Sequence, residues 1–107
     1  MSDECKVTVD GGVCKMITTI EAKSNPDTGM VEIEIHSDCP NVLRMSWSIQ
    51  PICPYTEVEG KMCETDVYKL ASESLPHAAC PVPCGMVKAV EVAGGLGLKR
   101  DVTIKIE

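Results

Sequence analysis

Seven cysteines are the residues of this 107-residue sequence best suited to chemistry. Two of them lie in one short pattern: His36-Ser37-Asp38-Cys39-Pro40 and His77-Ala78-Ala79-Cys80-Pro81 both have the form His-x-x-Cys-Pro. In each we predict that the cysteine is the N-cap of a helix and that the proline is its first helical residue. A thiol at that place faces free backbone N–H groups and the positive end of the helix dipole, which stabilise the thiolate. The pattern therefore indicates a metal ligand or a nucleophile.

A metal site follows if further thiols lie near these two. Cys80 and Cys84 are four residues apart, so they share one face of a helix. Cys14 begins a predicted strand and Cys39 follows the end of the next one, so a hairpin would bring both to one end of the sheet. Four thiolates, Cys14, Cys39, Cys80 and Cys84, would suit tetrahedral zinc or an iron–sulfur cluster, and the sequence does not separate the two cofactors.

The other candidate ligands have weaker patterns. His36, His77 and Cys63 are possible additional ligands, although a hydrogen-bonded or exposed histidine is the more common outcome. Cys53, between Pro51 and Pro54 in a predicted loop, is a weak ligand candidate like Cys63, and Cys5 is weaker still.

Composition excludes several classes of function. The net charge is −6 and only three residues are aromatic, whereas sequence-tolerant nucleic-acid binding needs basic and stacking side chains. The apolar runs are too short to span a membrane. Residues 1–5 resemble no signal peptide, so we expect a cytoplasmic protein with reduced thiols. No catalytic triad or phosphate-binding loop is present, so we expect a binding protein rather than an enzyme.

Hydrophobic periodicity predicts the elements that must position the thiols. Strands are expected at 4–9, 14–22 and 30–36, and a last strand at 102–106, where Val102, Ile104 and Ile106 alternate with polar residues. Helices are expected at 40–49, 65–71 and 81–93, with a loop over 55–62. The prediction is one α+β domain, residues 1–107: a small, mostly antiparallel sheet, built from an N-terminal hairpin and the C-terminal strand, with two or three helices on one face. An exposed edge strand, 4–9 or 102–106, would allow a homodimer.

The chain resembles the TSCPD family, small cysteine-rich proteins that also form the C-terminal module of some vitamin-B12-dependent ribonucleotide reductases. The resemblance covers roughly residues 12–93 and rests on four stretches: Gly12-Val13-Cys14, Gly29-Met30-Val31-Glu32-Ile33, Asp38-Cys39-Pro40-Asn41, and Ala79-Cys80-Pro81 with the following helix. It implies a small α+β domain whose cysteines bind metal, with Cys14, Cys39 and Cys80 on the family's cysteine positions. The chain departs from the family's motif at Val82, where the motif has Asp.

A second resemblance concerns Cys80-Pro81-Val82-Pro83, which is similar to the C-P-x-P motif of small sulfur-carrier proteins. It implies a carrier with Cys80 as nucleophile, and Cys84 could serve as resolving thiol. Three functions thus remain open. The first is a metal or iron–sulfur module that serves proteins of a redox, sulfur or metal pathway. The second is a thiol-based sulfur carrier, and the third is an interaction domain whose cysteines are structurally buried.

Overall fold

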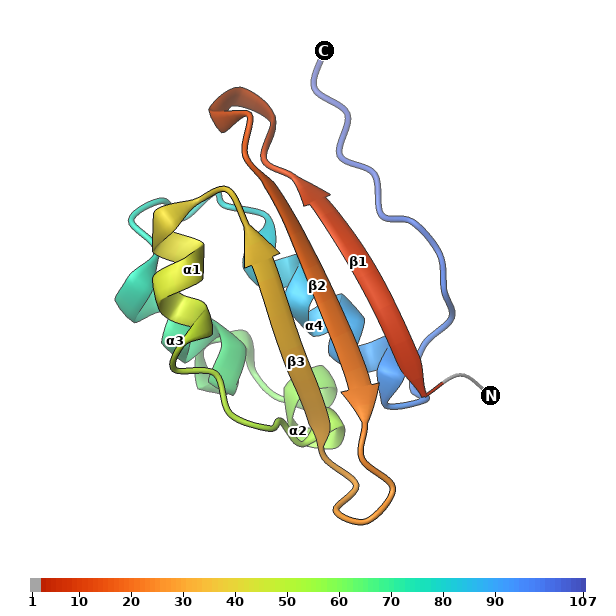
Figure 1. The fold of residues 1–107 in the computed structure, drawn as a ribbon. Helices are drawn as coiled ribbons and strands as arrows, with labels where there is room; N and C mark the ends of the chain where they lie inside the picture. Colours follow the sequence, from red (N-terminus) through yellow and green to blue (C-terminus); the bar gives the residue numbers. More distant parts are fainter. Residues whose placement is uncertain (1–2) are drawn as a thin grey trace.

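The computed structural model describes residues 3–107 and contains a three-stranded antiparallel sheet with four α-helices, which confirms the predicted α+β class. Chain order and bounds are β1 (Glu4–Asp10), η1 (Gly12–Cys14), β2 (Ile17–Ser24), β3 (Val31–Ser37), α1 (Pro40–Ser46), α2 (Pro54–Glu59), η2 (Met62–Glu64), α3 (Asp66–Ser74) and α4 (Val82–Ala93). The strands lie side by side in chain order, and the long helix α4 crosses behind them (Figure 1).

The sheet has one buried and one exposed face because its residues alternate. Opposite residues pair in the register Cys5–Ala22–Ile33 on the inner face and Lys6–Glu21–Glu34 on the outer face. The inner face packs against α4, whose buried residues include Met86, Ala89 and Val90. Since the outer face carries charged side chains from all three strands, only one layer of helices covers the sheet.

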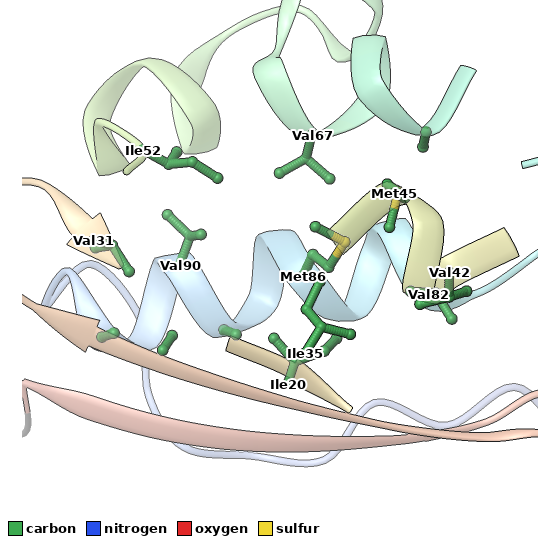
Figure 2. Packing of buried hydrophobic residues seen from close by; sticks show 14 residues of the cluster. Ile20, Val31, Ile35, Val42, Met45, Ile52, Val67, Val82, Met86 and Val90 are labelled. Atoms are coloured by element: carbon green, nitrogen blue, oxygen red, sulfur yellow. The ribbon is translucent and has the colours of Figure 1, made fainter. Parts of the chain in front are cut away.

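The core is aliphatic and is centred on Met86. Figure 2 shows Met86 of α4 directed toward Ile20 and Ile35 of the sheet and toward Met45 of α1. The helix also approaches the sheet closely at Gly85, where a Cβ atom would lie 2.5 Å from Val9 Cγ2. A side chain at position 85 would therefore push α4 away from β1.

The two edges of the sheet differ. At the β3 edge, Val31 and Ile52 form an isolated antiparallel bridge, with N···O distances of 2.8 and 2.9 Å. At the β1 edge no strand of the described residues is paired. The predicted strand 102–106 is wrong: residues 98–107 run extended beyond β1 with no assigned secondary structure, and their apolar side chains are exposed (Figure 1).

Three further expectations are corrected. Within the predicted loop 55–62, residues 55–59 belong to helix α2, so the fold has four helices rather than two or three. The second strand begins at Ile17, which leaves Cys14 in a 3-10 turn. The last helix begins at Val82 with Pro81 as its N-cap, so Cys80 precedes the cap instead of forming it. Pro81 at the N-cap and Pro83 in the first turn are both tolerated, because the first N–H groups of a helix have no acceptor within it.

Candidate functional site

The predicted thiol site lies at the end of the sheet where β3 runs into α1. Figure 1 places η1, the junction of β3 with α1, and the start of α4 at this same end. Asp38 ties the first two segments together: its backbone N–H donates to the Ile17 carbonyl, and its Oδ2 accepts from the Ile17 N–H at 3.2 Å. These bonds hold the segment that follows Cys14 beside the segment that precedes Cys39, and the convergence of the thiols themselves stays a prediction.

The side chains themselves do not form a coordination sphere. Cys39 and Cys80 are half-buried and pack against the same hydrophobic cluster, whereas Cys14 is exposed. Among residues 3–107, no three His, Cys, Asp or Glu side chains are grouped so that they could hold a metal ion. The zinc or iron–sulfur assignment to Cys14, Cys39, Cys80 and Cys84 stays a prediction.

Cys84 lies in a different environment from the other three predicted ligands. It is exposed and lines a hollow of about 170 Å³ together with Tyr68 of α3 and Glu57 of α2. Burial raises the pKa of Tyr68, and the neighbouring Cys84 thiolate raises it further. Cys84 thus faces the helices α2 and α3.

The additional candidates are dispersed. His36 is on the exposed outer face of the sheet, where its Nε2 lies 3.3 Å from Glu34 Oε1. His77 is exposed, and its carbonyl accepts a hydrogen bond from the Cys80 N–H. Cys63 is exposed in η2. All seven cysteines are free thiols; Cys5, Cys39 and Cys80 are half-buried against the core, whereas Cys14, Cys63 and Cys84 are exposed.

Cys53 is a functional candidate that the sequence pattern did not single out. It is the N-cap of α2, with Pro54 as first helical residue, as Cys39 and Pro40 are for α1. The nearby donors of Thr56, backbone and side chain, and the Tyr55 backbone lower the pKa of the Cys53 thiol, while the Thr56 hydroxyl itself donates to the Cys53 carbonyl at 3.2 Å. The Cys-Pro dipeptide occurs three times in the chain, and this shared signal could have identified Cys53 although no histidine precedes it by three residues.

The second notable region is the open β1 edge with the extended residues 98–107 beside it. Lys99 lies near the start of β1, where its charge lowers the pKa of Cys5 while burial, the larger effect, raises it. From Lys99 onward the chain follows the direction of β1 but stands apart from it (Figure 1). Val102, Ile104 and Ile106 are 57%, 77% and 92% exposed, so this apolar stripe covers nothing within the chain.

A hollow of about 670 Å³ beside the sheet has a mostly charged lining, with three lysines and four glutamates next to the apolar residues Cys5, Ala22 and Ile33: Lys6, Lys23, Lys99, Glu4, Glu21, Glu32 and Glu34. Exposed ion pairs such as Lys23 Nζ to Glu4 Oε1, 3.5 Å, cross the outer face of the sheet. No helix within residues 3–107 has the length and apolarity needed to cross a membrane.

Comparison with known proteins gives a family and no function. No curated protein and no solved structure matches the chain. The resemblance to TSCPD proteins therefore stays a prediction. A family of unknown function matches residues 5–106, which include both the thiol end of the sheet and the extended C-terminal residues. The chain belongs to this family of unknown function, DUF6951.

Proposed function

We propose that the protein is a non-catalytic interaction module that joins another polypeptide by strand addition at the β1 edge. The observation that carries this proposal is the open edge itself. The Ser24 N–H donates to the Asp3 carbonyl, and the Gly11 N–H donates to the Met16 carbonyl. Because backbone groups alternate in direction along a strand, those of the odd-numbered residues of β1 face β2. The N–H and C=O groups of Lys6 and Thr8 therefore point away from the sheet. A row of such groups is a template for another strand.

The contrast with the other edge supports the proposal. At the β3 edge other parts of the same chain lie against the strand, because Ile52 hydrogen-bonds to Val31 and α1 packs beside β3. Natural proteins protect an edge with a bulge, a proline, an inward-pointing charge or a charged side chain on the edge, and of these β1 has only the last, with Lys6 at its centre. β1 pairs with β2 in continuous register over Glu4–Asp10, without a bulge, and its inner residues are Cys5, Val7 and Val9.

The test places a photo-crosslinking amino acid at Thr8 and expresses the chain in its own cell. We expect an adduct with a second polypeptide, and we expect the same chain carrying Lys6→Pro to lose it. Proline at position 6 removes an outward N–H but none of the bonds to β2. The matched control carries the crosslinker at Tyr55, which is exposed on α2 away from the edge. The absence of any adduct from position 8, or an adduct unaffected by Lys6→Pro, would contradict the proposal.

A second candidate function is thiolate metal binding at the sheet end. It is favoured by the half-buried positions of Cys39 and Cys80 against the core and by the Asp38–Ile17 hydrogen bonds, which hold the segments next to Cys39 and Cys14 together. Zinc or an iron–sulfur cluster would be held by these three thiolates and a fourth ligand, for which Cys84 is the sequence-based candidate. The seven free thiols also fit a reducing compartment, the cytoplasm, and a partner in a redox or sulfur pathway.

Metal analysis of anaerobically purified protein tests this second candidate. We expect about one zinc ion or one cluster per chain, lost in Cys39→Ser and retained in Cys63→Ser, whose exposed thiol serves as matched control. Protein without zinc or iron, or equal loss in both variants, would contradict it.

A sulfur-carrier role is the remaining alternative, with Cys80 as nucleophile and Cys84 as resolving thiol. The lowered pKa of Cys53 makes that thiol an additional acceptor candidate for sulfane sulfur. Mass spectrometry after incubation with a persulfide donor would identify which cysteine gains one sulfur atom. Equal labelling of all seven thiols would contradict a dedicated carrier site.

A further inference from the structure

We infer that the β1 edge selects its partner strand by charge: the partner has a basic residue opposite Glu4, an acidic residue opposite Lys6 and apolar residues between them. The inference rests on the proposed function, because it names the chemistry of the polypeptide that adds to this edge. Its starting observation is the row of exposed side chains along β1, whose charge changes sign from Glu4 to Lys6 and again to Asp10.

The strand β2 shows which residues complement this row. Lys23 lies opposite Glu4, and its Nζ is 3.5 Å from Glu4 Oε1. Glu21 lies opposite Lys6. Side chains on one face of a sheet interact with the residues directly opposite them on both neighbouring strands. A strand added at the open edge therefore meets the same order of charges as β2 and needs the same complement.

The far end of β1 adds a second basic position to the partner. Asp10 lies opposite the apolar residue Ile17, so β2 places no opposite charge directly across from it. The Asp10 side chain is exposed, and its Oδ1 accepts a hydrogen bond from the Gly12 N–H at 2.9 Å. A partner with a basic residue there is basic at both ends and positive overall, which the chain's net charge of −6 attracts.

The inner side of the edge requires apolar residues between the charged ones. Cys5, Val7 and Val9 are half-buried and pack against the core, so they leave an apolar margin along β1. Successive side chains of a strand point to opposite faces, so every second residue of the partner is directed to this margin. Valine and isoleucine suit such half-buried positions.

The direction of the partner follows from the existing sheet. All its strands are antiparallel, and an antiparallel ladder is slightly more stable per residue than a parallel one. Residues 98–107 stand beside β1 without assigned secondary structure, so an added strand breaks no ladder there (Figure 1). Read from its N-terminus, the partner has the order basic, apolar, polar, apolar, acidic, apolar, basic. Its central polar residue is opposite Thr8, where β2 has Thr19.

The first experiment compares two fluorescent peptides of identical composition by fluorescence anisotropy. The complementary peptide is Lys-Val-Thr-Val-Glu-Val-Lys, and its control, Lys-Val-Thr-Val-Lys-Val-Glu, places like charges opposite Lys6 and Glu4. We expect the first to bind about three- to tenfold more tightly, because two attractive cross-strand pairs become repulsive in the second. The difference should shrink in about 1 M salt, which screens exposed charges. Equal affinities at low salt would overturn the inference.

The reciprocal change in the protein is Glu4→Lys combined with Lys6→Glu, which exchanges two charges without altering composition. The preference should reverse, so that the control peptide binds more tightly. Since this variant faces Lys23 and Glu21 with like charges, urea unfolding must show that it is folded. Lys6→Gln is the milder variant and should weaken the preference of the wild type without reversing it. A preference that Lys6→Gln leaves unchanged contradicts selection by charge.

Charge selection and strand addition fail in different ways. Equal binding of both peptides, lost in Lys6→Pro, would overturn charge selection and leave strand addition standing. Binding of neither peptide would also overturn the inference, while the adduct from position 8 would still decide the proposed function. A chain that doubles its mass without peptide and then excludes both peptides would identify a second copy as the occupant, which contradicts the inference as well.

Discussion

The two edges of the sheet are formed by similar strands but differ in how far the rest of the chain covers them. β3 and β1 each have seven residues and each pairs with β2 over a full antiparallel register. The chain partly closes the β3 edge itself, with Ile52 bonded to Val31 and α1 packed beside the strand, whereas residues 98–107 run past β1 without pairing. The difference shows that a strand's own sequence does not determine whether its edge is covered, because cover depends on what the rest of the chain can place there.

The largest expected effect is at the closed edge. Ile52 is 1% exposed and belongs to the hydrophobic core, so Ile52→Ala removes buried side-chain volume as well as cover for Val31. We expect the free energy of unfolding to fall by about 2–5 kcal/mol, measured by urea denaturation. The contrasting variant at the open edge is Thr8→Pro, which loses no bond to β2 and should cost much less. Equal losses in the two variants would mean that the edges do not differ in stability.

A smaller effect is expected at the helices that support the closed edge. Glu57 of α2 is 4% exposed, and its carboxylate accepts hydrogen bonds from the backbone N–H groups of Asp66 and Val67, at 2.5 and 3.2 Å. These are two of the free donors at the start of α3, and a carboxylate there also favours the helix dipole. Because Glu57→Ala leaves both donors without this acceptor, the free energy of unfolding should fall by about 1–3 kcal/mol.

The control for this variant lies on the same helix. Glu59 is exposed, so Glu59→Ala should leave the unfolding curve almost unchanged. If both variants unfold at the same urea concentration, Glu57 does not stabilise the start of α3.

Part of this organisation is predictable from sequence. Alternation of Val31, Ile33 and Ile35 with two glutamates places β3 and its buried face correctly, because a period of two determines which side faces the core. Helix α2 escapes prediction, since six residues between prolines and a glycine give no helical period. The same alternation at 102–106 predicts a strand that the structure lacks. A local pattern indicates which side chains would be buried. Whether a partner strand is available depends on the handedness of the crossover connection and on other chains.

The candidate site shows the same division between local and distant information. Cys39 is an N-cap before proline, as its sequence predicts, because cap and proline preferences act over adjacent residues. Cys80 lies one residue before its cap, and Cys84 faces α3 instead of the sheet end. The convergence of ligands depends on how helices pack, and spacing alone does not encode that packing.

The smallest expected effect compares two thiols, one near each edge. Hydrogen bonds from Thr56 and Tyr55 lower the pKa of Cys53, which follows Ile52 at the closed edge. Burial raises the pKa of Cys5 on β1, against the smaller opposing effect of Lys99. At neutral pH a larger fraction of Cys53 is therefore thiolate, and iodoacetamide should alkylate it several-fold faster than Cys5, as followed by peptide mass spectrometry.

The pH dependence of the two alkylation rates distinguishes ionisation of the thiols from their accessibility to the reagent. As the pH rises, Cys53 should reach its full alkylation rate first, and the ratio of the two rates should narrow once Cys5 is also ionised. Thr56→Val removes the side-chain donor while keeping the shape of the residue, so it should move the Cys53 profile to higher pH and leave the Cys5 profile in place. A rate ratio that stays constant with pH would mean that access alone sets the difference. A Cys5 rate that falls with rising protein concentration would indicate that a second chain covers the β1 edge.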